Sequence, residues 1–350
     1  MAPTLIKTEF DGHTRSGDLV EKLETGRLRC TACAHLCELA DGQRGVCKVR
    51  FHEDGDLRVP FNYAAGVHND PIEKKPFFHA LPGTRALSFG MLGCDFKCSY
   101  CQNWFTSQTL RDASATVRFS ETTPEQLSVL ALREGARTLV STYNEPLITS
   151  EWAVAVFKEA RRHGLNTAYV SNGHGTPQVI DYIAPWIDFY KVDLKCFDDR
   201  NYRKLGGSLK EVLETIQRIH ARGLWLEIVT LVIPHHNDSD AELQDIAGFL
   251  ADVSCDIPWH VTAFRPEYKM NDRGATPVET LLRAHEIGRK AGLNFVYCGN
   301  LAGRVMGLEN TVCPGCGEVL IERVGFRMAR NRLVDGQCPD CRSEIPGRWS

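Results

Sequence analysis

The sequence lacks three features that would point to a membrane, to export or to a polyanionic partner. No apolar run approaches the length of about 18 residues that a membrane-spanning helix requires. The first twenty residues contain neither the basic segment nor the apolar segment of a secretory signal. The net charge of −3 gives no general attraction for nucleic acid or an anionic membrane surface. We therefore expect a cytoplasmic protein with no membrane partner, and we do not expect nucleic acid to bind.

Cysteine, by contrast, is abundant, and most of the 14 cysteines are grouped. The three groups are Cys30, Cys33, Cys37 and Cys47; Cys94, Cys98 and Cys101; and Cys313, Cys316, Cys338 and Cys341. In a reducing compartment, CxxC spacings favour metal sites over disulfides, although a disulfide scaffold is the alternative. The sequence therefore predicts metal binding at three places in the chain.

Strand-like and helix-like segments alternate between about residues 84 and 298. Short segments rich in β-branched and aromatic residues predict strands at 85–92, 136–142, 166–171, 187–194, 224–233, 259–264 and 294–298. Apolar residues at helical spacing predict helices over 123–135, 209–223 and 239–253. Repeated βα units imply an α/β fold, and about six of them favour a partial (β/α)6 TIM-type barrel. In such folds the chemistry lies at the carboxyl ends of the strands.

Two cysteine-bearing regions flank this predicted core, so the domains are expected at 1–83, 84–303 and 304–350. The C-terminal "CPGCG" and "CPDC" knuckles together offer four thiolates to one tetrahedral ion and predict a structural zinc ribbon. The N-terminal "CTACAHLC" and Cys47 offer four more, with His35 as a substitute ligand. Zinc is the preferred metal there, and an auxiliary iron–sulfur cluster with the same ligands is the alternative.

The middle group places three cysteines in "GMLGCDFKCSYCQNW", directly after the first predicted core strand. Three thiolates hold three corners of a [4Fe–4S] cluster and leave one iron open to a substrate or cofactor. The alternative is a zinc ion completed by a distant ligand. A catalytic zinc usually recruits histidine or carboxylate ligands, so the cluster is favoured.

The spacing CxxxCxxC at the end of a first strand resembles the signature of the radical S-adenosylmethionine (radical SAM) enzymes. The resemblance implies that the open iron chelates the amino and carboxylate groups of SAM. An electron from the reduced cluster would then cleave the sulfonium and release methionine and a 5′-deoxyadenosyl radical that abstracts hydrogen.

The resemblance also implies roles for residues at the later strand ends. "STYNEP" is similar to the motif that binds the SAM amino group, which implicates Asn144 and Glu145. Further cofactor-binding residues are expected in "VSNG", in "VDLK", next to adenine in "LVIPHHND" and between the last two loop cysteines: Ser171, Asn172, Asp193, Ile233 and Tyr100. "VDLK" is similar to the glycyl-radical-enzyme activases and gives Asp193 and Lys195 as catalytic candidates. A structural ion pair or an ordinary turn is the alternative at these positions.

Segments along most of the chain resemble the AmmeMemoRadiSam system radical SAM protein, a family related to the pyruvate formate-lyase activating enzymes. They include "GQRGVCKVR", "DPIEKKPFFHALPGT", "PWHVTAFRPEYKM", "YCGN" and "IPGRW". The resemblance implies an AMMECR1-domain protein and a Memo-like protein as partners, and a ferredoxin- or flavodoxin-type electron donor. It names no substrate.

The substrate is expected near polar residues that follow the last strands: His260, Arg265, Tyr268, Lys269 and Asn300. Three functions stay open at this point: hydrogen abstraction from a small molecule or protein, activase-like modification of a partner protein, and a SAM-binding, metal-bearing adaptor. RNA modification is weaker, because the basic ribbon lacks an aromatic platform.

Overall fold

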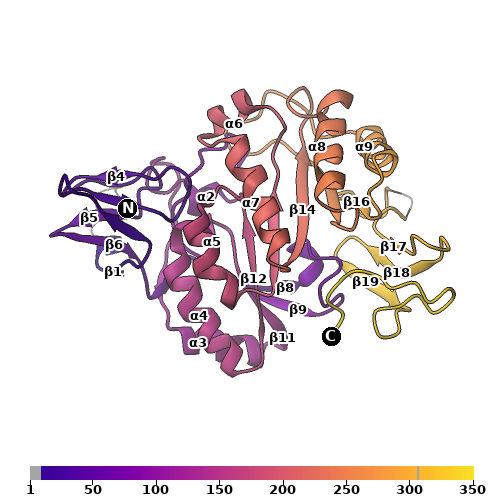
Figure 1. Cartoon of the computed structure of the whole chain (residues 1–350), viewed down its shortest axis with the longest axis horizontal. Helices are drawn as coiled ribbons and strands as arrows, with labels where there is room; N and C mark the ends of the chain where they lie inside the picture. Colours follow the sequence, from indigo (N-terminus) through magenta and orange to yellow (C-terminus); the bar gives the residue numbers. More distant parts are fainter. Residues whose placement is uncertain (1–8, 306) are drawn as a thin grey trace.

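One eight-stranded sheet forms the centre of the molecule (Figure 1). The computed structural model describes residues 9–305 and 307–350. From one edge to the other, the strands are β16 (Val296–Gly299), β15 (Trp259–Ala263), β14 (Trp225–Val232), β13 (Phe189–Asp193), β12 (Asn166–Ser171), β11 (Ala136–Ser141), β9 (Arg85–Gly90) and β8 (Gly66–Pro71). β8 is antiparallel to β9, and all other neighbours are parallel. The structure thus confirms a mainly parallel sheet, with a strand at each of the seven predicted positions.

Helices connect the parallel strands and pack on the outside of the sheet (Figure 1). The longer ones are α3 (Pro124–Arg133), α4 (Ser150–Arg162), α7 (Leu209–Ala221), α8 (Asp240–Val253) and α9 (Val278–Lys290). Shorter helical segments are α2 (Trp104–Ser107), α5 (Pro177–Ile183), α6 (Asp199–Leu205), η1 (Ile72–Lys74), η2 (Pro146–Thr149) and η3 (Ala184–Trp186). The predicted start of α3 is confirmed, because the Thr123 side chain accepts a hydrogen bond from the Gln126 N–H and Pro124 opens the helix.

The apolar stripe predicted for α8 packs against the sheet. Leu243, Ile246, Ala247 and Leu250 are fully buried, and Val253 at the end of the helix is half-buried. Burial of a large aliphatic side chain stabilises a fold by about 1.5–3 kcal/mol. The stripe therefore fixes which face of the helix meets the strands.

The N-terminal region consists of small antiparallel sheets beside the main sheet, at the left of Figure 1. They pair β1 (Thr14–Ser16), β6 (Asp56–Pro60) and β5 (Phe51–Glu53); β2 (Val20–Lys22), β3 (Leu28–Cys30) and β4 (Glu38–Leu39); and β7 (Tyr63–Ala64) with β10 (Ser120–Glu121). Buried Arg50 joins this region to α4 through two 2.7 Å contacts with Glu151. Residues 66–71 of the predicted N-terminal region belong to the main sheet as β8.

The C-terminal region is a three-stranded antiparallel sheet of β17 (Thr311–Val312), β18 (Val319–Val324) and β19 (Arg327–Asn331). Buried polar contacts hold it to the core. Arg323 donates to the Phe78 carbonyl at 2.7 Å, and the two ring nitrogens of His79 meet the Pro346 carbonyl at 2.7 Å and the Tyr297 hydroxyl at 2.6 Å. In the described part of the chain, the helices are too short or too polar to cross a membrane.

Candidate active site

The three-cysteine loop begins four residues after β9, at the carboxyl edge of the parallel strands. Cys98 is buried, and Cys94 and Cys101 are half-buried. The Phe96 N–H donates to Cys94 Sγ at 3.3 Å, and Cys101 Sγ lies 3.2 Å from Ser107 Oγ. Burial raises the pKa of all three thiols, that of Cys98 to about 12. A metal that binds here must therefore displace protons, as thiolate ligands require.

A cavity of about 1150 Å³ opens beside the loop at the strand ends. Its walls come from the cysteine loop, the strand ends, the connector before β9 and the hairpin of β18 and β19. The lining includes Cys98, Tyr100, Lys195, His260 and Phe326. Ligand pockets usually measure about 300–1,000 Å³. The cavity thus has room for a cofactor together with a second small molecule.

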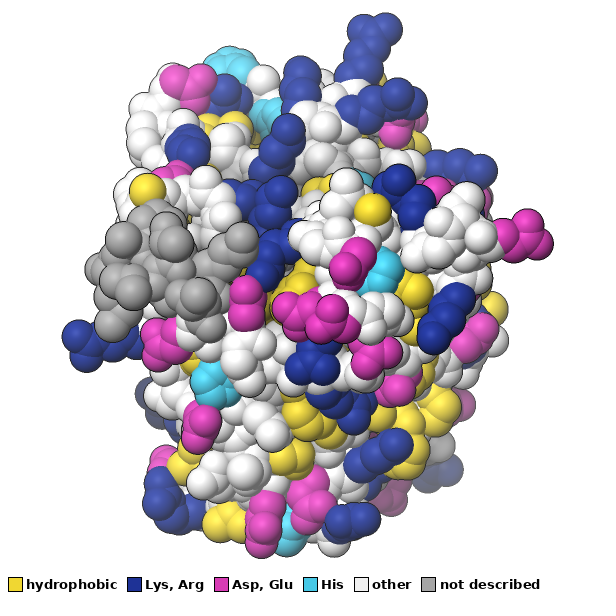
Figure 2. Space-filling model, turned by 90° about the vertical axis from the view of Figure 1, so that its left-hand side faces the viewer, with side chains coloured by type: hydrophobic (Ala, Val, Ile, Leu, Met, Phe, Trp, Pro, Cys, Tyr) yellow, Lys and Arg dark blue, Asp and Glu magenta, His cyan; other side chains and the backbone are white. Residues whose placement is uncertain are grey.

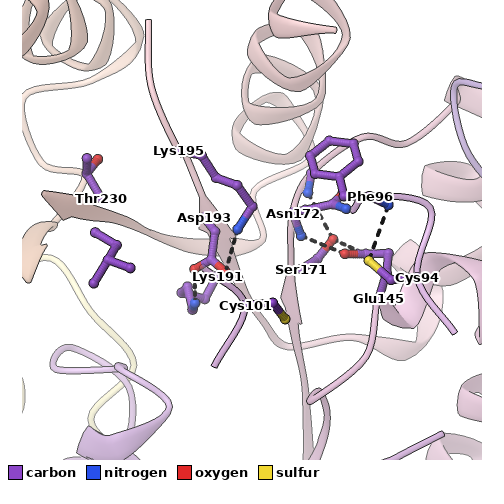
Figure 3. A network of polar contacts seen from close by, with 12 residues as sticks. Cys94, Phe96, Cys101, Glu145, Ser171, Asn172, Lys191, Asp193, Lys195 and Thr230 are labelled. Atoms are coloured by element: carbon purple, nitrogen blue, oxygen red, sulfur yellow. Dashed lines mark hydrogen bonds and ion pairs between the residues drawn. The ribbon is translucent and has the colours of Figure 1, made fainter. Parts of the chain in front are cut away.

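Two lysines flank Asp193 at the end of β13 (Figure 3). Lys191 contacts one carboxylate oxygen of Asp193, and Lys195 Nζ lies 3.5 Å from the other. All three side chains line the cavity. Burial disfavours the ionised form of Asp193, but the two ammonium groups lower its pKa below the usual range. Lys191 was not predicted from the sequence, although alternate residues of a strand share a face and "KVD" therefore places 191 and 193 together.

Glu145 is the centre of a second, fully buried network (Figure 3). One carboxylate oxygen accepts hydrogen bonds from Ser171 Oγ at 2.6 Å and Leu147 N–H at 3.1 Å, and the other accepts from Asn172 N–H at 2.7 Å. Burial and the charge of Asp95 nevertheless raise the pKa of Glu145 to about 8. The structure therefore brings three predicted cofactor-binding residues together in one network.

Of the remaining predicted cofactor residues, Tyr100 lines the cavity, whereas Asn144 and Ile233 are buried behind its lining. Asn144 is buried and accepts a hydrogen bond from the Met91 N–H at 3.0 Å. As far as the described residues define the lining, it includes Tyr100 but not Asn144, Ile233 or the Glu145 network. Tyr100 is buried, and its hydroxyl has no hydrogen-bond partner among the described residues. It is the predicted aromatic residue that a bound molecule would meet directly.

Asp95, which follows the first loop cysteine, was also missed from the sequence. Its carboxylate accepts from the Asn172 side-chain amide at 2.7 Å and lies 3.0 Å from His174 Nδ1. His35 Nε2 lies 3.3 Å from the Asp95 carbonyl oxygen. His35, proposed from the sequence as a substitute metal ligand, is therefore engaged with the cysteine loop. Hydrogen bonds account for both carboxylate oxygens of Asp95 without an ion.

The substrate-facing residues expected from the sequence fall into two sets. His260, Arg265 and Asn300 line the cavity, and buried His260 meets Glu227 at 2.7 Å. Tyr268 and Lys269 instead bind Asp112, at 2.6 and 2.7 Å. Only the first set faces the space in which a substrate would lie.

The four cysteines of the C-terminal region, called the ribbon cysteines below, converge as ligands of one ion do: Cys313, Cys316, Cys338 and Cys341. Sγ–Sγ distances are 3.6 Å between Cys313 and Cys341 and 3.7 Å between Cys316 and Cys338. Tetrahedral zinc with bonds of about 2.3 Å places its sulfurs about 3.8 Å apart. The ribbon therefore has the donor set and spacing of a single-ion site.

The four N-terminal cysteines lie near one another but are not packed as closely. Burial raises the pKa of Cys33, Cys37 and Cys47, that of Cys47 to about 11, and the nearby Cys30 adds to each rise. Arg50 Nε donates to Cys30 Sγ at 3.1 Å. Across residues 9–305 and 307–350, neither these cysteines nor the loop cysteines supply three ligand atoms within 4.8 Å of one another.

The fold and site define an α/β protein in which parallel strands end at a thiol-rich loop and a charged cavity. The profile of the radical SAM superfamily matches residues 90–250. An uncharacterised protein of Methanocaldococcus jannaschii is 34% identical over 314 residues, which cover 89% of this chain and 92% of that protein. The chain belongs to the radical SAM superfamily, and it is an enzyme.

Two further relatives are activating enzymes. The isethionate sulfite-lyase activating enzyme of Oleidesulfovibrio alaskensis is 29% identical over 164 residues, or 45% of this chain and 52% of that enzyme. The pyruvate formate-lyase-activating enzyme of Clostridium pasteurianum is 23% identical over 205 residues, or 54% and 81%. The chain is thus related to the pyruvate formate-lyase activating enzymes. The family implies a [4Fe–4S] cluster and SAM, and the soft thiol donors of the loop fit such a cluster.

Proposed function

We propose that this enzyme cleaves SAM reductively and abstracts a hydrogen atom from an unidentified small molecule or protein. The observation that supports this function is the position of Cys94, Cys98 and Cys101 at the end of β9, beside the cavity. Three thiolates leave one iron of a [4Fe–4S] cluster open. When bound, the cluster and SAM supply an electron and a 5′-deoxyadenosyl radical.

The residues around the loop would then hold SAM. The carboxylate of Glu145 is proposed to accept a hydrogen bond from the amino group of SAM. Ser171 and Asn172 are proposed to orient the ribose or carboxylate of SAM. Tyr100, whose hydroxyl has no hydrogen-bond partner within the described residues, would contact adenine from the cavity wall, and Ile233, which is buried behind that wall, is proposed for the other side. The support for these roles is that Glu145, Ser171 and Asn172 share one network and that Tyr100 lines the cavity.

Asp193 and Lys195 are proposed as the catalytic pair at the cavity wall. The positive charge of Lys195 opposes the rise in the pKa of Cys98 and Cys101 that burial causes. Lys195 therefore favours thiolate ligands in the loop. Asp193, held between two ammonium groups, keeps its charge and fixes their positions.

The sheet is proposed to be an incomplete TIM-type barrel, and the ribbon to bind zinc. Seven parallel strands in chain order support the barrel, and the sulfur spacing supports zinc. Because Cys313 and Cys338 pack in one cluster with Phe78 and Tyr297, zinc would also stabilise the side of the core that the ribbon covers.

Within the superfamily, we assign the chain to the AmmeMemoRadiSam system. Its partners would then be an AMMECR1-domain protein, a Memo-like protein and a ferredoxin- or flavodoxin-type electron donor. Figure 2 shows a column of Lys and Arg side chains on the face nearest the N-terminal region, which suits an acidic electron carrier. The activating-enzyme relatives support protein modification as a second candidate function.

The test is anaerobic reconstitution with iron and sulfide, followed by incubation with dithionite and SAM. We expect 5′-deoxyadenosine from the wild type and from Cys255→Ala, which removes an exposed cysteine outside the three groups. Cys94→Ala should form none while keeping zinc in the ribbon. Undiminished 5′-deoxyadenosine from Cys94→Ala would refute the mechanism.

Substrate and adaptor functions need a second experiment. Deuterium-labelled candidate partner proteins and cell metabolites are added in turn, and deuterium transfer into 5′-deoxyadenosine is followed by mass spectrometry. Transfer identifies the molecule from which hydrogen is taken. SAM binding without cleavage under any of these conditions would favour the adaptor function instead.

A further inference from the structure

Four cysteines of the N-terminal region lie outside the cavity-lining loop and have no role in the function proposed above. We propose that they form a metal site that holds an iron–sulfur cluster of its own and not a single zinc ion, with four ligands: Cys30, Cys33, Cys37 and Cys47. Cys30 ends β3, the next two cysteines lie between β3 and β4, and Cys47 precedes β5. Three of the four are buried, and Cys37 is half-buried.

The spacing of the sulfur atoms carries the proposal, because the same chain contains both kinds of site. The ribbon thiols approach to 3.6 and 3.7 Å, as ligands of one ion do. Thiolates on different corners of a cluster bind different iron ions, so they lie farther apart. The loop cysteines, which fit a [4Fe–4S] cluster, do not bring three ligand atoms within 4.8 Å of one another. Among the described residues, the four N-terminal cysteines do not do so either.

The surroundings of the N-terminal thiols suit a charged cluster. Arg50 is fully buried and donates to Cys30 Sγ at 3.1 Å, while its other nitrogens bind Glu151 and a carbonyl oxygen. The Val46 N–H points to Cys37 Sγ at 3.5 Å. A buried anion needs such partners, and donors to sulfur stabilise thiolate ligands. His35, the alternative ligand, is turned to the Asp95 carbonyl instead.

The proposed site lies against the cysteine loop of the active site. Gly93, next to the first loop cysteine, has φ +86°, and a Cβ there would lie 2.9 Å from the carbonyl oxygen of Cys47. Arg111 donates to the carbonyls of Phe96 and Val46 and so joins the two loops. Reduced clusters this close are expected to broaden each other's electron paramagnetic resonance signals.

The test counts metals in protein reconstituted anaerobically with iron-57 and sulfide. The wild type and Cys255→Ala should hold about eight iron ions per chain, four for each cluster, and one zinc. The variant Cys94→Ala/Cys98→Ala/Cys101→Ala should keep about four irons, and Cys37→Ser should lose iron from the second site. In the triple variant, Mössbauer and paramagnetic resonance spectra should show a cluster that dithionite reduces.

The decisive protein is the triple variant, because the sequence of its N-terminal region is unchanged and all four proposed ligands are kept. No iron in this variant, with either one or two zinc ions per chain, would overturn the proposal. The outcome is independent of the proposed function, since SAM cleavage is not measured. Failure of the wild type to cleave SAM, with iron retained in the triple variant, would refute only that function.

Discussion

The buried ion pair between Arg50 and Glu151 should hold the N-terminal region against α4. Both side chains are closed to solvent, and two N–O distances are 2.7 Å. Removing one member of a buried pair costs about 3–5 kcal/mol, because the other charge is left without its partner. In Glu151→Ala, the Arg50 guanidinium keeps two of its partners among residues 9–305 and 307–350, the Ile148 carbonyl and Cys30 Sγ. We therefore expect Glu151→Ala to lose the full amount of about 3–5 kcal/mol in the stability of this contact.

An exposed ion pair in the same region provides a matched control. Arg29 and Glu38 also meet at 2.7 Å, but their side chains are 35% and 46% exposed. Exposed pairs contribute about 0–1 kcal/mol, so Glu38→Ala should have little effect. The double variant Arg50→Met/Glu151→Leu replaces both charges with apolar groups and should be more stable than Glu151→Ala.

Hydrogen exchange measured by mass spectrometry reports the local cost. A factor of ten corresponds to about 1.4 kcal/mol, so exchange in β3 and β5 should accelerate roughly 100- to 5,000-fold in Glu151→Ala. Amides of β14 serve as the internal reference, since they lie in the middle of the main sheet. Equal exchange rates in Glu151→Ala and Glu38→Ala would show that burial of the pair does not matter.

Three other parts of the molecule give further predictions: His79, Gly93 and the C-terminal cysteines. Burial lowers the pKa of His79 to about 4, so unfolding takes up a proton between about pH 6.5 and 4. The free energy of unfolding should therefore fall as the pH drops through that window. In denaturant titrations, His79→Asn should flatten this pH dependence, and an unchanged pH dependence would contradict the assignment. Gly93→Ala should lower the iron content of the reconstituted protein, because its Cβ would meet the Cys47 carbonyl oxygen. The control Gly135→Ala, with φ +67° and open surroundings, should lose only about 1–2 kcal/mol of stability. Equal iron contents in the two variants would count against the contact at Gly93. A chelator that removes zinc should expose residues 309–350 to protease while the loop keeps its iron, and protection without zinc would argue against a structural metal.

The main sheet was predictable because its signals are local. Each parallel strand is a short run of β-branched and aromatic residues, and helical stripes such as that of α8 separate the runs. Thr123 and Pro124 fix the start of α3 by capping alone. β8 escaped prediction, since "GVHNDP" lacks an apolar pattern and owes its place in the sheet to pairing with β9.

The site was predictable in its residues and not in their contacts. The first loop cysteine comes four residues after β9, and Asp193 is the last residue of β13, so their place at the carboxyl edge follows from the fold. Sulfur spacing depends on how β3, β4 and β5 pack, which no spacing along the chain reveals. For the same reason, a zinc-like ribbon and a wider N-terminal group look alike as CxxC motifs.

Asp95 shows why the cysteine loop depends on more than its own sequence. Burial opposes its ionisation, yet the hydrogen bond with His174 and the charges around it lower the pKa of Asp95 below the usual range. Its carboxylate ties the loop to Asn172 after β12, and its carbonyl oxygen meets His35 of the N-terminal region. The loop is therefore held from two sides by groups far away in the chain. His35 stands between Cys33 and Cys37 in the sequence and contacts the residue next to Cys94, so it joins Gly93 and Arg111 in linking the N-terminal cysteines to the loop.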